Sequence, residues 1–151
     1  MKYEIVSLEK KEIAGYSIRT TNHGNQAVVA IGRMWQEFFE KNLIESIENR
    51  ISQTVIGLYT EYEGDYTKPY TFVCGCEVSS KKETKTIYEG EYAKFTVYGD
   101  SKTAVGPIWQ YVWQSDLDRN YRSDFEEYHF DFNEEGHQTI DVYIGLKKQI
   151  D

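Results

Sequence analysis

The chain is 151 residues long, with 28% charged residues and a formal net charge of −8. One domain over residues 1–151 is the expectation at this length, and the composition excludes a disordered or membrane-embedded chain. The 17 basic and 25 acidic residues argue against nucleic-acid binding, which needs a basic surface, whereas an acidic field attracts cationic small molecules.

The first half of the chain carries strand, helix and strand signals in turn. Residues 1–4 have strand-like sequence without an apolar signal segment, which predicts a cytoplasmic protein. A strand over 12–20 precedes a loop around His23 and an amphipathic helix over about 32–39, which carries Trp35. Strands over 54–61 and 70–78 follow, and the polar residues 79–86 are predicted to form an exposed linker.

The second half repeats this order of signals. A strand over 91–98 contains Tyr92, and a helix over 106–113 carries Trp109 and Trp113 one turn apart on the same face. Pro107 suits the first turn of that helix, where its missing N–H is not needed. Residues 116–118 are a predicted turn, and strands over 124–130 and 139–146 follow it.

An internal repeat accounts for the matching order. Residues 32–36 (GRMWQ) and 106–110 (GPIWQ) share glycine, tryptophan and glutamine at a constant offset. Each half, at about 1–80 and 81–151, is therefore predicted to be a β-α-β-β module. We expect an α+β fold whose antiparallel sheets carry two main helices related by a pseudo-two-fold axis, with a groove between the halves as a natural ligand site.

Residues 124–128 (DFEEY) alternate acids with aromatic rings on a predicted strand. Successive side chains of a strand point to opposite faces, so Glu126 and Tyr128 share one face while Phe125 and Glu127 share the other. One glutamate must lie on the covered face, where a carboxylate is costly unless a cation, a basic side chain or a catalytic role compensates it. Alternation alone does not say which glutamate this is.

Motifs for cofactors and metals do not occur in the sequence. It has no phosphate-binding glycine loop, dinucleotide fingerprint or nucleophile elbow, and we expect no cofactor. Cys74 and Cys76 flank one glycine and are predicted to be buried filler rather than a disulfide or metal site. His23, His129 and His137 have no metal-ligand spacing and are expected at the surface.

Four motifs in order resemble the GyrI-like effector-binding domains: residues 92–95 (YAKF), 106–109 (GPIW), 124–128 (DFEEY) and 140–144 (IDVYI). In the first half, residues 55–59 (VIGLY) and the strand at 70–78 are similar to the integron-associated effector-binding subgroup. The resemblance covers nearly the whole chain. It implies a duplicated β-α-β-β fold with a ligand pocket, related to the ligand-binding domains of AraC- and MerR-type multidrug regulators. The 151 residues leave no room for a helix-turn-helix domain, so we expect no direct transcriptional activity.

In the drug-sensing relatives, one pocket glutamate and several aromatic residues bind lipophilic cations. The resemblance maps that glutamate onto Glu126, in preference to Glu127. The expected aromatic lining takes tryptophans from both helices and tyrosines from the strands: Trp35, Trp109, Trp113, Tyr59, Tyr92, Tyr128 and Tyr143. Each ring could instead be core. Tyr143 would face the other side of the sheet if its aliphatic neighbours pack on the helices.

Three functions stay open on the sequence. The first is a stand-alone protein that binds an amphipathic, cationic small molecule and either sequesters it or presents the bound state to a partner. The second is a hydrolase of reactive cyclopropane-bearing compounds, as some GyrI-like proteins are, with Glu126 and Tyr128 as the catalytic residues. The third is a protein-interaction module of the gyrase-inhibitor type. The resemblance favours the first, with neither nucleic acid nor membrane as partner.

Overall fold

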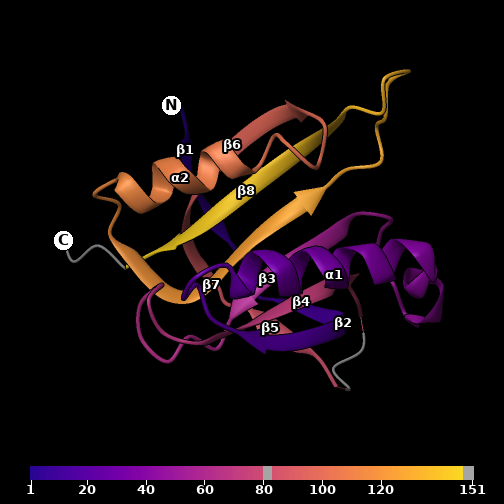
Figure 1. The fold of residues 1–151 in the computed structure, drawn as a ribbon, viewed down its shortest axis with the longest axis horizontal. Helices are drawn as coiled ribbons and strands as arrows, with labels where there is room; N and C mark the ends of the chain where they lie inside the picture. Colours follow the sequence, from indigo (N-terminus) through magenta and orange to yellow (C-terminus); the bar gives the residue numbers. More distant parts are fainter. Residues whose placement is uncertain (80–82, 148–151) are drawn as a thin grey trace.

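Eight strands and two α-helices make up the described part of the chain, residues 1–79 and 83–147 of the computed structural model (Figure 1). In chain order the elements are β1 (Glu4–Leu8), β2 (Lys11–Thr20), α1 (Gln26–Glu40), a short 3-10 helix (Leu43–Ser46), β3 (Val55–Thr60), β4 (Tyr70–Glu77), β5 (Lys85–Ile87), β6 (Gly90–Gly99), α2 (Gly106–Gln114), β7 (Arg119–Tyr128) and β8 (Gln138–Leu146). The predicted α+β class is confirmed, and Pro107 lies in the first turn of α2 as expected.

The strands form one sheet in the order β1-β6-β8-β7-β3-β4-β2-β5, with antiparallel pairing throughout. This order is symmetric. When β1 to β4 of the first half are exchanged in turn for β5 to β8 of the second, the same order results, read from the other edge of the sheet. The halves meet where β3 pairs with β7, from Val55 opposite Tyr128 to Thr60 opposite Ser123. The predicted duplication is therefore confirmed, and its pseudo-two-fold axis passes between β3 and β7.

The sequence does not predict the two short edge strands as they occur: residues 1–4 are strand-like, but β1 runs over Glu4–Leu8, and β5 is not predicted. β1 pairs with β6 of the second half and β5 pairs with β2 of the first, so each half contributes an edge strand to the other. Segments this short show no usable periodicity. β5 begins in the segment predicted as a linker and extends one residue beyond it. Residues 80–82 of that linker, with the boundary between the halves, lie outside the described residues.

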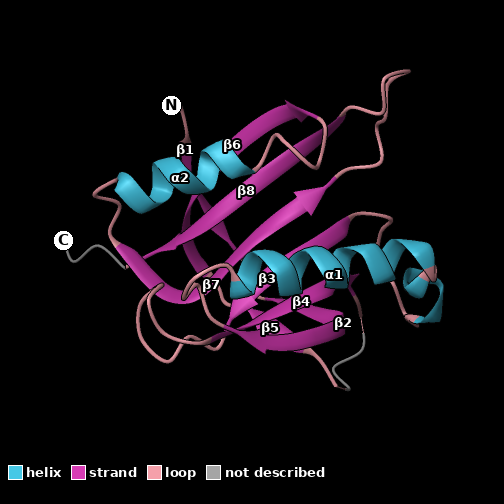
Figure 2. Cartoon of the chain, viewed as in Figure 1, coloured by secondary structure: helices cyan, strands magenta, loops and turns pink. Residues whose placement is uncertain are grey.

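Both helices lie on one face of the sheet, with α1 over the first half and α2 over the second (Figures 1 and 2). α1 buries Phe38 in a cluster with Phe72, and α2 buries Ile108 and Val112 in a cluster that includes residues of β6 and β8. The opposite face holds a third apolar cluster, against which β1 and β5 pack. No helix in the described ranges is long and apolar enough to cross a membrane.

β7 differs from its prediction at both ends. It begins at Arg119 instead of residue 124 and ends at Tyr128, before the exposed Phe130. A register shift separates Arg119 from Asp124, and Tyr121 between them has a φ of 54°. Such a bulge interrupts the alternation by which a strand is predicted. The sequence therefore hides the start of β7, although the predicted turn at 116–118 does join α2 to it.

Candidate functional site

The pairing of β3 with β7 places a glycine directly opposite Glu126. Gly57 is the partner of Glu126 in the ladder. A Cβ on Gly57 would lie 2.8 Å from Trp35 Cζ2 and 3.2 Å from Glu126 Oε1. Glycine therefore leaves the space that the indole of Trp35 needs to lie over the sheet beside the carboxylate.

A cavity of about 970 Å³ opens between α1, α2 and the middle of the sheet. Aromatic rings from both halves of the chain line it: Trp35, Phe39, Tyr59, Tyr62, Tyr66, Tyr70, Trp109, Trp113 and Tyr128. Glu126 and Arg119 are its buried charged residues. Apolar walls with a few convergent polar groups are the usual form of a small-molecule site, and this volume is at the upper end of the range of about 300–1,000 Å³.

Glu126 is a buried carboxylate in the wall of this cavity. It is 2% exposed. Trp109 Nε1 and the Tyr59 hydroxyl donate hydrogen bonds to its Oε2 at 2.7 and 3.0 Å, and the Tyr128 hydroxyl donates to Oε1 at 2.7 Å. No basic side chain among the described residues pairs with it. Burial raises the pKa of Glu126 above its ordinary value, although the three hydrogen bonds oppose this rise.

The tyrosine hydroxyls around Glu126 are held in the protonated form. Burial, and then the charge of Glu126, raises the pKa of Tyr59 and of Tyr128 well above the ordinary range. The same two causes raise the pKa of Tyr70 to about 12. A protonated phenol can donate, so Tyr59 and Tyr128 keep both carboxylate oxygens hydrogen-bonded at neutral pH.

The two helices bring one tryptophan each to the neighbourhood of Glu126. The ring of Trp109 lies 4.9 Å from that of Tyr59, and the ring of Trp35 lies 5.1 Å from that of Tyr128. Trp113 lies 6.4 Å from Trp109 and is 47% exposed. Electron-rich ring faces attract cations. The two halves thus direct rings and one carboxylate at a single space.

The structure brings six of the eight predicted ligand-binding residues to the cavity: Trp35, Tyr59, Trp109, Trp113, Glu126 and Tyr128. It also separates the two glutamates of the DFEEY motif. Glu126 faces the helices, and Glu127 lies on the other face of the sheet, opposite Asp141.

Tyr92 and Tyr143 do not line the cavity, which corrects their predicted position. Both belong to the apolar cluster on the opposite face of the sheet. Tyr143 stacks on Phe125 with ring centres 4.4 Å apart, and the hydroxyl of Tyr92 is 2.7 Å from that of Ser123. Strand alternation explains the position of Tyr143, because its neighbours in β8 pack in the cluster of α2.

Several further residues of the cavity wall are not predicted from the sequence. Tyr62 and Tyr66 lie in the β3–β4 connection, as expected of loop residues, but their side chains line the cavity. No local pattern marks them. Tyr70, by contrast, begins the alternation of β4 that includes Phe72, and this signal could have placed it on the helix-facing side.

Outside the cavity, three side chains are placed as metal ligands could be. Glu127, His129 and Asp141 offer ligand atoms within 4.8 Å of one another. His129 Nε2 and Asp141 Oδ2 are 2.7 Å apart, so a hydrogen bond accounts for that contact. Of the three histidines expected at the surface, His23 is exposed, and His129 and His137 are half-buried. The two cysteines are buried and unbridged, as expected: Cys74 and Cys76.

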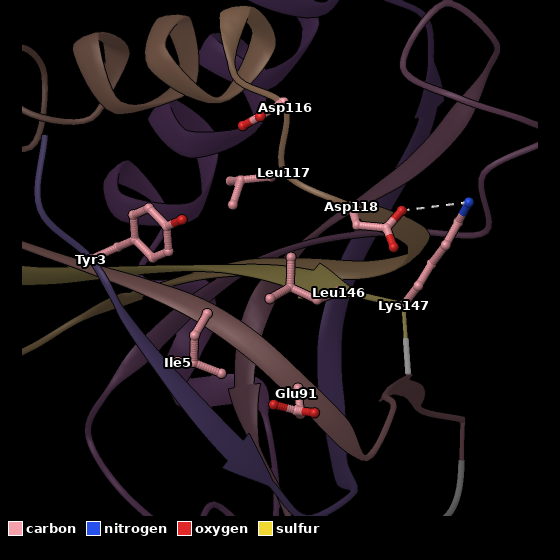
Figure 3. A pocket seen from close by; sticks show the side chains of 8 residues that line it. All are labelled: Tyr3, Ile5, Glu91, Asp116, Leu117, Asp118, Leu146 and Lys147. Atoms are coloured by element: carbon pink, nitrogen blue, oxygen red, sulfur yellow. Dashed lines mark ion pairs between the residues drawn. The ribbon is translucent and has the colours of Figure 1, made fainter. Parts of the chain in front are cut away.

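A second hollow, of about 390 Å³, lies near the N-terminus (Figure 3). Its lining comes from β1 and the residue before it, from β6, from the α2–β7 connection, and from the end of β8 and the residue after it: Tyr3, Ile5, Glu91, Asp116, Leu117, Asp118, Leu146 and Lys147. Among the described residues that line it, one ion pair forms, between the exposed side chains of Lys147 and Asp118 at 3.7 Å. The larger cavity, which combines aromatic walls with a buried carboxylate, is therefore the candidate site.

Two fused repeats that enclose one ring-lined cavity define a small-molecule-binding protein. Residues 4–146 match the family model Cass2, described as integron-associated effector binding protein. The chain belongs to this family, which confirms the resemblance seen in the sequence.

Solved structures and a curated relative agree with this assignment over nearly the whole chain. The integron cassette protein VCH_CASS2, from the mobile metagenome of Vibrio cholerae, is 25% identical with a TM-score of 0.75, covering 96% of this chain and 95% of its own. SAV2435, solved bound to tetraphenylphosphonium, has the same fold at 17% identity and a TM-score of 0.75, covering 97% and 94%. YobU of Bacillus subtilis strain 168, provisionally named a transcriptional regulator, is 24% identical over 159 residues, 95% of this chain and 97% of its own.

Proposed function

We propose that this protein binds a lipophilic, singly charged cation in the cavity between α1 and α2, with Glu126 as the counter-charge. The observation that carries the proposal is the environment of Glu126. Its carboxylate is 2% exposed and accepts hydrogen bonds from three neutral donors. A basic partner is lacking among the described residues, so the ionised group leaves one uncompensated negative charge beside the cavity.

The energetics of burial favour a cation over other ligands. Removing a carboxylate from water costs several kcal/mol, and neutral hydrogen bonds recover only part of this. Burial raises the pKa of Glu126 for the same reason, because it disfavours the ionised carboxylate relative to the protonated one. A bound cation offsets it by direct charge attraction, which is strong because the surrounding rings exclude water.

The rest of the cavity suits a lipophilic ion. Each ring face near the charge can add about 0.5–2 kcal/mol of cation–π attraction, and the aromatic walls bury apolar groups. SAV2435, whose fold this chain shares, was solved with tetraphenylphosphonium, a lipophilic monocation, and this supports the proposal by analogy. The family description and the provisional name of YobU favour a role in sensing such compounds or sequestering them.

Two nearly isosteric ions of opposite charge test the proposal. Tetraphenylphosphonium and tetraphenylborate differ in charge and hardly in shape. We expect titration at pH 7.5, followed by the fluorescence of the cavity tryptophans, to favour the phosphonium by at least about tenfold, because a single buried charge decides between them. Equal affinities, tighter binding of the borate, or failure of the phosphonium to bind at all would refute the function.

A further inference from the structure

A second charged side chain lines the same cavity at the start of β7. Arg119 has a side chain that is only 4% exposed. Its Cζ lies 4.3 Å from the ring centre of Tyr121 and 5.9 Å from that of Trp109. The bulge between Arg119 and Asp124 allows this position, because it breaks the alternation that would otherwise set the direction of the side chain.

Most hydrogen-bonding capacity of this guanidinium is unused. An arginine has five N–H donors. Within residues 1–79 and 83–147, the one hydrogen bond of the Arg119 guanidinium runs from Nη2 to Asp124 Oδ2, at 2.9 Å. Its Nε is buried without a partner, and no other side-chain nitrogen or oxygen in the described ranges shares that condition. A buried donor left unsatisfied destabilises the fold, and folded proteins seldom leave one without a reason.

The charge of Arg119 is already compensated. Asp124 is fully buried, and besides Arg119 it accepts hydrogen bonds from the Tyr62 hydroxyl at 2.6 Å and from the Gly145 N–H at 2.8 Å. Arg119 and Asp124 together are neutral, so Glu126 alone sets the net charge of these groups. A neutral oxygen could take the free N–H donors and leave this balance intact, whereas an anionic group would add a second uncompensated charge.

One ring connects the two charged groups. Trp109 donates from Nε1 to Glu126, and the Arg119 guanidinium lies 5.9 Å from the centre of the same indole. Asp124 and Glu126 also occupy alternate positions of β7 and therefore share a face. A ligand that lies along the indole of Trp109 can thus contact both Glu126 and Arg119.

We propose that Arg119 forms a second polar subsite of the cavity, which binds a neutral oxygen acceptor, such as a carbonyl, carried by the cationic ligand. This inference rests on the proposed function and narrows its ligand class to monocations that carry such an oxygen. Tetraphenylphosphonium, which has no oxygen, would fill only the Glu126 end.

Two phosphonium ions of equal charge and similar shape test the subsite. Each is a tetraphenylphosphonium in which one of the four rings carries a para substituent, acetyl in one compound and isopropyl in the other. Wild-type protein is expected to bind the acetyl compound about five- to tenfold more tightly, the usual worth of one added hydrogen bond. In Arg119→Lys, which keeps the charge opposite Asp124 and removes the Nε–H, the ratio falls to about one. The exposed Arg122, stacked on Tyr88, supplies the control Arg122→Lys, which keeps the wild-type ratio.

The Nε–H resonance of Arg119 in wild-type protein gives a second measurement, which holds even if Arg119→Lys fails to fold. The chemical shift of this resonance is expected to change on addition of the acetyl compound and to remain unchanged on addition of the isopropyl compound. A wild-type ratio of one, a ratio that survives in folded Arg119→Lys, or an unmoved resonance overturns the subsite. If both compounds bind equally, the proposed function stands and the subsite falls. If neither binds, both fall together.

Discussion

Replacing Glu126 by glutamine removes the buried carboxylate charge from the cavity wall and keeps the shape of the side chain. The glutamine carbonyl can still accept from Trp109 and Tyr59, and its amide can donate to the Tyr128 hydroxyl, so the three hydrogen-bonded neighbours stay satisfied. A phosphonium centre shielded by its phenyl groups would lie about 6 Å from the carboxylate. At an effective dielectric constant of about 20, that charge pair contributes about 2.8 kcal/mol, or about 100-fold in affinity.

The assay is titration of tetraphenylphosphonium into Glu126→Gln and into a matched control, Glu127→Gln. Glu127 is the next residue of β7 and lies on the opposite face, half-buried. We expect the first variant to lose about 100-fold in affinity and the control to stay within about twofold of wild type. Wild-type affinity in Glu126→Gln, or equal losses in both variants, would refute the role of Glu126 as counter-charge.

The raised pKa of Glu126 also fixes the sign of the pH dependence. Ligand affinity should fall as pH drops through that pKa, which lies above the ordinary value of 4.5, and the fall should be absent from Glu126→Gln. The contribution of Glu126 to the stability of the fold has the opposite pH dependence. A carboxyl whose pKa is higher folded than unfolded contributes stability below its unfolded pKa, and that contribution is lost as pH rises through the folded pKa. Glu126→Gln should therefore be at least as stable as wild type at pH 7.5, as measured by urea unfolding. A loss above about 2 kcal/mol would mean that the fold itself needs the carboxylate.

Four further substitutions test residues around the cavity and on the opposite face of the sheet. Trp109→Phe keeps a ring but removes the Nε1–H donor, so cation affinity should fall about fivefold and the pH midpoint of binding should rise, because that hydrogen bond lowers the pKa of Glu126. Gly57→Ala would put a Cβ 2.8 Å from Trp35 Cζ2 and should cost about 1–3 kcal/mol in urea unfolding. Gly32→Ala on α1, where nothing lies within 4 Å of the added Cβ, should cost nothing or stabilise by about 0.5–1 kcal/mol. Tyr143→Phe should leave cation affinity within about twofold of wild type, and a larger change would contradict its position on the opposite face of the sheet.

Much of the architecture follows from patterns within short stretches of the sequence. The repeated Gly-x-x-Trp-Gln segments reveal the duplication, and hydrophobic periodicity locates both helices and most strands. Alternation within the DFEEY motif pairs Glu126 with Tyr128 and separates both from Glu127. These features are local, because each depends on the geometry of one helix or one strand.

The tertiary structure decided whatever depends on how distant segments pair. The register of β3 against β7 sets Gly57 opposite Glu126 and makes room for Trp35. Packing of the β8 aliphatic residues in the cluster of α2 turns Tyr143 away from the cavity. The bulge in β7, invisible to any period-two pattern, puts Arg119 in the cavity wall. Strand register and bulges arise from contacts between residues far apart in the chain, so no single stretch of sequence carries them.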